Sequence, residues 1–295
     1  MQLWSRIAAI LCLGFLPTTL AVAASVDYQI ERMKDNVYRF TAGHYRSVFL
    51  VGEQGIFIAD PLGKPAAQWL QRQLRERFDV PVRYMAYSHN HVDHTLGGDV
   101  FAESGVTVIA QQYAAEDLAW TRAPTATPDI TFEKELRVNL GDDYVLLRYY
   151  GPNNGRGSVS MRFMPANVVH VVDWVVLGRM PYQNLPGYDI HGMIRSTRAL
   201  LAEEPFELFV GGHAEAGKRE DVERYLHYLE RLYGAVRDGM LAGKDLPTLQ
   251  KEIRLPEFRD LKMYDAWLPA NIEGVYRTLM DQSYFNLRED IRPVP

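Results

Sequence analysis

The feature that most constrains the fold of this chain is a cluster of three histidines and one aspartate. They follow the apolar segment 82–87 in the order His89-x-His91-x-Asp93-His94. Neutral imidazole and carboxylate are ligands that zinc-type ions prefer. In an extended segment the first three project to the same side, and a turn at Asp93 and His94 divides the four groups between two adjacent metals. The cluster therefore predicts a metal site at the end of a strand; solvated loop residues are the alternative.

The N-terminal segment 1–24 differs from the rest of the chain. Arg6 supplies a short basic start, an apolar run follows over 7–16, and small residues lead to Ala23 and Ala24. This pattern is typical of a secretory signal peptide that is cleaved near those alanines. An N-terminal membrane anchor is the alternative, but the apolar run is short for a span of roughly 20 residues. We expect a protein exported to the periplasm or secreted, with no stable membrane anchor after cleavage.

Cysteine content and charge exclude several classes of function. The only cysteine, Cys12, lies in the predicted signal peptide. The remaining chain therefore has no disulfide, and no thiolate is present as a metal ligand or nucleophile. The formal net charge is −5 and the chain has no run of Lys and Arg, which argues against nucleic acid as the main partner.

The order of predicted elements indicates a single domain of the α/β class. A helix starts near Pro65, a hairpin occupies 130–150, and a helical stripe of apolar residues runs from Val222 to Met240. The predicted strands are 37–40, 47–51, 56–59, 82–87, 106–110, 158–163, 168–174 and 206–210. Strands and helices alternate before a helical C-terminal part, and no linker divides the chain. We expect residues 25–295 to form one domain, with two sheets and helices outside them.

The histidine cluster resembles the hallmark motif of the metallo-β-lactamase superfamily, in which His-x-His-x-Asp-His follows a strand. The resemblance extends from about Val37 to Val210, and less distinctly into the C-terminal helices. It implies a four-layer αββα sandwich of the metallo-β-lactamase type. It also implies a metallohydrolase that binds one or two Zn²⁺ ions, with other divalent metals remaining open.

The resemblance assigns roles to three residues that follow other strands. Asp60 ends the segment 56–60 and matches an aspartate that orients a metal ligand, although a turn residue is the alternative. Asp173 matches the carboxylate that bridges two metals, and His213 matches the last histidine ligand of the family. Taken alone, either residue would more often be structural. His170 is an odd number of residues from Asp173, so we expect it on the opposite face of the strand, packed or at the surface.

The sequence departs from the family at Asn154. The family places a metal-binding histidine in the turn at 150–158, where this chain has Asn154. An amide oxygen is a harder and generally weaker zinc ligand than imidazole. If each residue takes the role of its counterpart in the family, the second metal site has all four of its ligands, namely Asp93, His94, His213 and Asp173. The first metal site then has His89 and His91, with Asn154 or water as a further ligand and with Asp173 shared between the two sites. Three outcomes stay open: two metals with a weak first site, one metal, or lost catalysis.

The predicted reaction is hydrolysis of a small-molecule substrate by metal-bound hydroxide. The bond is an ester, thioester, lactone, lactam or sulfate-type bond, and Asp93 is the candidate catalytic residue that holds the nucleophile. A true β-lactamase is less favoured, because Asp173 as a bridging ligand resembles hydrolases outside that group. Export argues against the cytosolic thioesterases and nucleases of the superfamily. The alternatives are a non-catalytic or weakly active metal-binding protein on the same scaffold, and an exported carbohydrate- or protein-binding module.

Two segments bear on the choice of substrate. The loop 178–188 is rich in turn-forming and aromatic residues, and it either walls a substrate pocket or packs under the C-terminal helices. Arg156 either attracts an anionic group of the substrate or remains a solvated loop residue.

Overall fold

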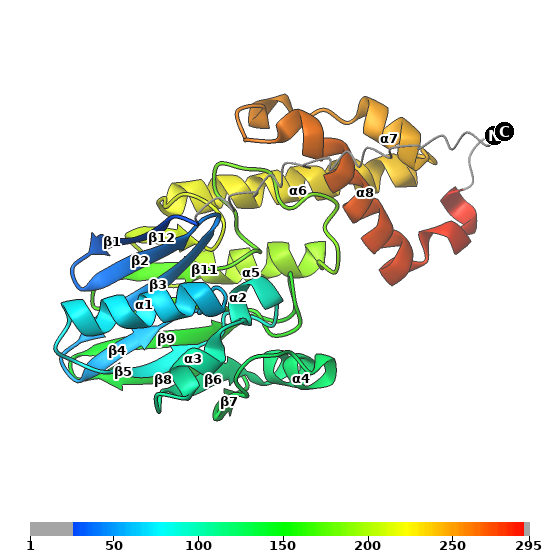
Figure 1. The fold of residues 1–295 in the computed structure, drawn as a ribbon. Coiled ribbons are helices and arrows are strands. Elements are labelled where there is room, and N and C mark those ends of the chain that lie inside the picture. Colours follow the sequence, from blue (N-terminus) through cyan, green and yellow to red (C-terminus); the bar gives the residue numbers. More distant parts are fainter. Residues whose placement is uncertain (1–25, 292–295) are drawn as a thin grey trace, which may run out of the picture.

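The computed structural model describes residues 26–291 as two β-sheets with helices on their outer faces (Figure 1). The predicted α/β class and four-layer αββα arrangement are therefore confirmed. The predicted signal peptide, residues 1–24, lies outside the described residues and stays a prediction. No helix within residues 26–291 has the length and apolar character needed to cross a membrane.

The first sheet contains seven strands of the described chain, in the order β1-β2-β3-β4-β5-β6-β7. Neighbours from β1 to β4 are antiparallel, and neighbours from β4 to β7 are parallel. The strands are β1 (Tyr28–Lys34), β2 (Val37–Ala42), β3 (Tyr45–Gly52), β4 (Gly55–Ile58), β5 (Val82–Ala86), β6 (Thr107–Gln111) and β7 (Ile130–Phe132).

The second sheet has five strands within residues 26–291, in the order β12-β11-β10-β9-β8. They are antiparallel except for β11 and β12, which run parallel. The strands are β8 (Glu135–Leu140), β9 (Asp143–Tyr149), β10 (Val159–Met164), β11 (Val168–Val171) and β12 (Leu208–Gly211).

Apolar side chains separate the four layers. The outer face of the first sheet packs against α1 (Lys64–Arg77), α3 (Gly98–Ala102) and α4 (Gln112–Thr121). Between the sheets, Phe57 and Phe163 meet edge to face with ring centroids 5.9 Å apart. The outer face of the second sheet packs against α5 (Ile190–Ala202) and α6 (Arg219–Leu241). Burial of these apolar faces is the main favourable contribution to folding.

The C-terminal part is helical, as predicted, and extends beyond the ends of the sheets (Figure 1). After α6 come α7 (Leu246–Glu252) and α8 (Tyr264–Ser283), with three short 3₁₀ helices, η1 (Pro256–Phe258), η2 (Phe285–Leu287) and η3 (Glu289–Ile291). The apolar stripe on α6 is wider than predicted, because Tyr225, Tyr228 and Leu232 are buried beside it.

The boundaries of two predicted strands differ from the structure. The segment 130–132 does not belong to the following hairpin, since it pairs in parallel with β6 in the other sheet. Strand β11 ends at Val171 rather than at residue 174, because the chain turns at Asp173, which takes a φ of 67°. A left-handed backbone is uncommon for a residue other than glycine. This turn directs Asp173 toward the end of the sheet.

Candidate metal centre

The predicted site residues come together because each follows a strand at the same edge of the two sheets. Asp60 follows β4 and His89 follows β5 in the first sheet. In the second sheet Asn154 follows β9, Asp173 follows β11 and His213 follows β12. The ends of paired strands bring these five loops to one place, although up to about 150 residues separate them in the sequence.

The histidine motif folds as a loop followed by one helical turn. His91 is the N-cap of α2 (Val92–Thr95), and the backbone N–H of Thr95 donates to its carbonyl at 3.0 Å. The motif is therefore extended only as far as His91, and the helical turn carries Asp93 and His94 away from the first two histidines. Gly97 then takes a φ of 92°, and a Cβ there would lie 2.6 Å from the carbonyl carbon of Gly63. A glycine is needed for this close approach.

The first group of candidate ligands is His89, His91 and Asp173. The Nε2 atom of His89 and the Nδ1 atom of His91 lie 3.1 and 3.2 Å from the same oxygen, Oδ2 of Asp173. His89 is fully buried, and its Nε2 has no hydrogen-bond partner within the described residues. Convergence of two imidazole nitrogens on one carboxylate oxygen is a donor set that fits a divalent metal.

The second group is Asp93, His94 and His213. The Nε2 atoms of His94 and His213 face each other at 2.9 Å, and Oδ2 of Asp93 lies 3.8 and 3.6 Å from them. Oδ1 of Asp173 lies 3.0 Å from Nε2 of His213. Asp173 therefore offers one oxygen to each group, as the sequence resemblance implied.

Two buried side chains behind the groups orient the histidines. Asp60 lies 3.0 Å from Nδ1 of His94, and it also accepts hydrogen bonds from the backbone and the hydroxyl of Ser88. The Ser88 hydroxyl lies 2.8 Å from Nδ1 of His89. These contacts occupy the Nδ1 atoms and leave both Nε2 atoms for a metal. Burial lowers the pKa of His94, but the hydrogen bond and charge of Asp60 outweigh it and raise that pKa to about 9.

Asn154 lies in the first group but makes a different contact. It is buried, its Nδ2 donates to Oδ2 of Asp173 at 3.2 Å, and its Oδ1 has no hydrogen-bond partner among the described residues. A buried carbonyl oxygen without a partner costs free energy, so this atom is a candidate ligand. Rotation of the amide by about 180° would exchange its two ends and present the oxygen beside Asp173.

The turn that carries Asn154 is held by α5. The backbone N–H of Asp189 donates to the Asn153 carbonyl at 2.7 Å. Gly192 lies so close that a Cβ there would overlap the Pro152 carbonyl oxygen. The absence of a side chain at Gly192 therefore allows α5 to support the turn.

Replacing Gly192 by alanine is expected to lower the free energy of unfolding by about 3 kcal/mol, because the backbone at Pro152 must move. Gly234→Ala in α6 is the matched control, since the nearest atom to its Cβ would lie 4.0 Å away. We expect the control to be neutral or to gain about 0.5–1 kcal/mol. Denaturant unfolding measures both, and equal effects would contradict this view of the turn.

The structure excludes His170 from the centre and adds residues that the sequence did not indicate. His170 is buried, and its Nδ1 lies 2.8 Å from the Val210 carbonyl oxygen, in agreement with the packed position expected for it. The ring of Tyr45 lies 5.3 Å from that of His213 and 6.1 Å from that of His94. No pattern in the sequence indicated the position of Tyr45, which precedes the predicted strand 47–51 and begins β3 in the structure. Ser88 directly precedes the histidine motif, and its hydroxyl at this position was the one feature of the sequence that could have indicated its role.

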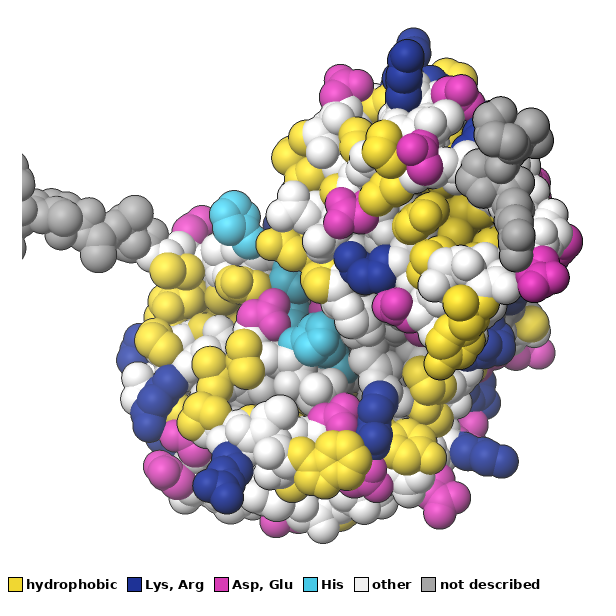
Figure 2. All heavy atoms as spheres, turned by 90° about the vertical axis from the view of Figure 1, so that its right-hand side faces the viewer, with side chains coloured by type: hydrophobic (Ala, Val, Ile, Leu, Met, Phe, Trp, Pro, Cys, Tyr) yellow, Lys and Arg dark blue, Asp and Glu magenta, His cyan; other side chains and the backbone are white. Residues whose placement is uncertain are grey.

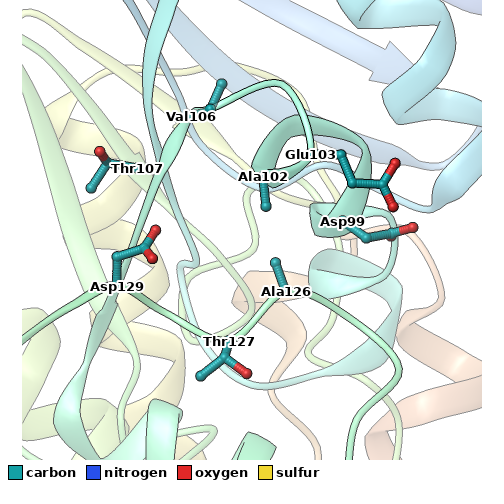
Figure 3. Close-up of a pocket in the computed structure, with 9 residues that line it drawn as sticks. Asp99, Ala102, Glu103, Val106, Thr107, Ala126, Thr127 and Asp129 are labelled. Carbon is teal, nitrogen blue, oxygen red and sulfur yellow. The ribbon is translucent and has the colours of Figure 1, made fainter.

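The centre is open to solvent on one face of the molecule. Figure 2 shows histidine side chains in a hollow, with acidic side chains beside them and a Lys or Arg side chain on the wall above. A separate cavity of about 610 Å³ is lined by residues of α3, β6 and the segment 126–129, as Figure 3 shows. Two of its carboxylates already have partners: Asp99 pairs with Lys64 at 2.9 Å, and Asp129 accepts a hydrogen bond from the Val108 N–H.

Solved structures similar to this chain are metallo-β-lactamases. A metallo-β-lactamase from Pontibacter korlensis superposes with a TM-score of 0.63 and 16% sequence identity, covering 69% of this chain and 99% of that one. The DIM-1 metallo-β-lactamase gives a TM-score of 0.60 and 17% identity, covering 70% of this chain and 99% of that one. At this identity the likeness concerns the fold, and about a third of this chain lies outside it.

Two curated relatives are subunits of one enzyme from Nocardioides sp. (strain JS1661). The alpha subunit of 2,4-dinitroanisole O-demethylase is 27% identical over 220 residues, 73% of this chain and 66% of that subunit. The beta subunit is 27% identical over 231 residues, 75% of this chain and 69% of that subunit. The match thus covers slightly less than two thirds of the alpha subunit. No family model matches the chain. On the structural comparison, the chain has the metallo-β-lactamase fold.

Proposed function

We propose that this protein is a zinc-dependent hydrolase that acts on an ester, thioester, lactone or related bond. The observation that carries the proposal is the position of Asp173, whose two oxygens lie in the two groups of histidines, at 3.1 Å from His89 and 3.0 Å from His213. Such a shared carboxylate suits two neighbouring divalent ions. The Nε2 of His89 and the Oδ1 of Asn154 support the same reading, since both are buried atoms that can bind a metal and that have no hydrogen-bond partner in the described chain.

The residues of the chain have distinct parts in this proposal. His89, His91 and Asp173 would hold the first ion with Asn154, and Asp93, His94, His213 and Asp173 the second. Bound zinc would lower the pKa of water to about 7 and polarise the electrophile. Asp93 belongs to the second group, and its side chain is about one third exposed. Its carboxylate would accept a proton from the attacking water and return it to the leaving group, so that one water is consumed for each bond cleaved.

The names of the two relatives suggest which bonds to test. Both are subunits of an enzyme named for removing a methyl group from the oxygen of 2,4-dinitroanisole. An aromatic substrate with an activated carbon–oxygen bond should therefore be tested together with esters, thioesters, lactones and lactams. The alternative, a non-catalytic metal-binding protein, is favoured by one contact, the hydrogen bond from Asn154 to Asp173 where the family has a ligand.

The first test combines metal content with hydrolysis. We expect purified protein supplied with zinc to hold at least one ion per chain and to hydrolyse members of a panel such as 4-nitrophenyl acetate, 2,4-dinitroanisole, a γ-lactone and a cephalosporin. A chelator should abolish activity and added zinc should restore it, because the donor groups converge on the metal positions. Protein that binds no zinc would refute the proposal. Protein that binds zinc without hydrolysing any substrate would favour the non-catalytic alternative.

A further inference from the structure

The turn that carries Asn154 contains a dipeptide with a reactive side chain. Asn154 is followed by Gly155, and this is the only Asn-Gly pair in the chain. Asparagine is one of the chemically labile residues of proteins. A glycine leaves its own backbone nitrogen accessible, because it has no Cβ that would shield that nitrogen from the preceding side chain. The nitrogen of Gly155 can therefore attack Cγ of Asn154 and expel the side-chain nitrogen as ammonia.

The peptide group between Asn154 and Gly155 is not held by hydrogen bonds. Neither the Asn154 carbonyl nor the Gly155 N–H has a hydrogen-bond partner within residues 26–291. The contacts that anchor the turn lie on either side of this peptide group. The Asp189 N–H donates to the Asn153 carbonyl at 2.7 Å, and Arg156 pairs with a glutamate of α4 at 2.6 Å instead of being left for an anionic ligand. Rotation of the peptide group toward Cγ of Asn154 therefore breaks none of its own hydrogen bonds.

The side-chain amide of Asn154 is buried at the metal centre. Its Nδ2 donates to Oδ2 of Asp173 at 3.2 Å, and its Oδ1 has no hydrogen-bond partner among the described residues. The nitrogen that leaves in such a reaction therefore lies against Asp173. The side chains of His91 and Asp93 in the same centre are each about one third exposed, and Figure 2 shows histidines in a hollow at the surface. Water can reach the amide, and ammonia can leave, by this opening.

Two polar atoms without a partner lie beside Gly155. A Cβ built on Gly155 would lie 3.2 Å from Oγ of Ser158 and 3.3 Å from Oδ1 of Asn90. Both atoms are buried, and neither has a hydrogen-bond partner within the described residues. Buried acceptors of this kind cost free energy unless a donor reaches them. Here they are the acceptors beside the Gly155 N–H, and they can hold that group as the peptide rotates toward Asn154.

We propose that Asn154 is converted to aspartate in the folded protein, and that this modification supplies the first metal position with a carboxylate ligand. In the first step a bond forms between the Gly155 nitrogen and Cγ of Asn154, and the bond from Cγ to Nδ2 breaks. The proton of the Gly155 N–H leaves with that nitrogen as ammonia. In the second step one water opens the cyclic imide at Cγ, which restores the Gly155 N–H and leaves a carboxylate at position 154. One water is consumed and one ammonia is released, without an oxidant or reductant.

The modification changes the charge of the first group of candidate ligands. Two carboxylates side by side repel each other, so a carboxylate at position 154 next to Asp173 is favoured only with a cation between them. A divalent ion held by His89 and His91 supplies that cation, and a carboxylate is an anionic ligand where the amide oxygen is a neutral one. The departure from the family at Asn154 is then the precursor of a ligand. This inference does not depend on which bond the protein hydrolyses.

Peptide mass spectrometry tests the conversion directly. Trypsin releases residues 149–156 as one peptide, because an arginine precedes it and another ends it. In zinc-loaded protein incubated at neutral pH, we expect this peptide to be about 1 Da heavier than the encoded sequence, with fragment ions that place the change at Asn154 and not at Asn153. Gly155→Ala is the matched variant, since its Cβ crowds the attacking nitrogen and should slow the conversion about tenfold or more. Wild type that keeps the amide, or Gly155→Ala that converts equally fast, would overturn the inference.

Zinc titration with competing chelators determines whether the product is a ligand. Asn154→Asp carries the product from the start and is the reference. We expect converted wild type to match Asn154→Asp, and both to bind the first zinc about tenfold or more tightly than unconverted Gly155→Ala. Converted wild type that binds zinc no more tightly than Gly155→Ala, or fragment ions that show only isoaspartate, would mark the conversion as damage and refute the inference. Neither measurement requires hydrolysis of a substrate, so the hydrolase proposal is tested separately.

Discussion

Asp173→Asn is expected to reduce zinc binding at both positions and to lower kcat/KM by more than about 100-fold, the largest effect of any single substitution in the centre. Both oxygens of Asp173 are in use, with Oδ2 close to His89 and His91 and Oδ1 close to His213. Burial would raise the pKa of Asp173, but its close contacts with His213, His89 and His91 outweigh it and hold the pKa well below its ordinary value. An uncharged amide supplies only one acceptor oxygen and no negative charge.

The measurement for Asp173→Asn is zinc per chain by elemental analysis, together with the rate on whichever ester the wild type hydrolyses. Asp99→Asn is the matched control, because Asp99 pairs with Lys64 at the surface of another region and lines the separate cavity. The control should keep its zinc content and activity. Asp173→Asn protein that retains two zinc ions would contradict the shared-carboxylate arrangement.

The candidate ligands could be predicted from the sequence on two grounds: the cluster at 89–94 is a local signal, and Asn154, Asp173 and His213 were matched through the resemblance to the metallo-β-lactamase superfamily. Four of them lie within six residues, and the others directly follow apolar segments that the structure confirms as the strands β9, β11 and β12. Strand ends at one edge of a sheet converge whatever the length of the connecting chain. The helical turn at His94 is also local, and the division of the motif into two groups agrees with the prediction from spacing.

The environment of the ligands could not be predicted, because it depends on contacts between distant segments. Tyr45 reaches His213 across about 170 residues, and the backbone of Asp189 supports the turn of Asn154 from the start of α5. Neither pair carries a periodic pattern or a turn signal. The early end of β11 was missed for a related reason. A run of apolar residues predicts a strand as far as it continues, whereas the chain takes a left-handed turn at Asp173, whose carboxylate contacts histidines of distant segments.

Asn154→His is expected to increase the affinity of the first position for zinc about 10–100-fold and to bring the zinc content toward two ions per chain. Imidazole is the stronger zinc ligand. In the wild type, Nδ2 of Asn154 donates to Oδ2 of Asp173, the oxygen that also faces His89 and His91. That hydrogen bond competes with the first ion, and the histidine would replace it by a ligand nitrogen.

Two further variants determine what the amide itself does. If Oδ1 of Asn154 is a ligand, Asn154→Ala should weaken the first ion, because the buried oxygen that now lacks a partner is removed. Equal affinities of Asn154→Ala and wild type would assign that position to water. Asn139→His, at an exposed site of β8, controls for the added imidazole. Zinc titration with competing chelators measures the affinities. If Asn154→His binds zinc no more tightly than the wild type, the residue at position 154 does not limit the zinc affinity of the first site.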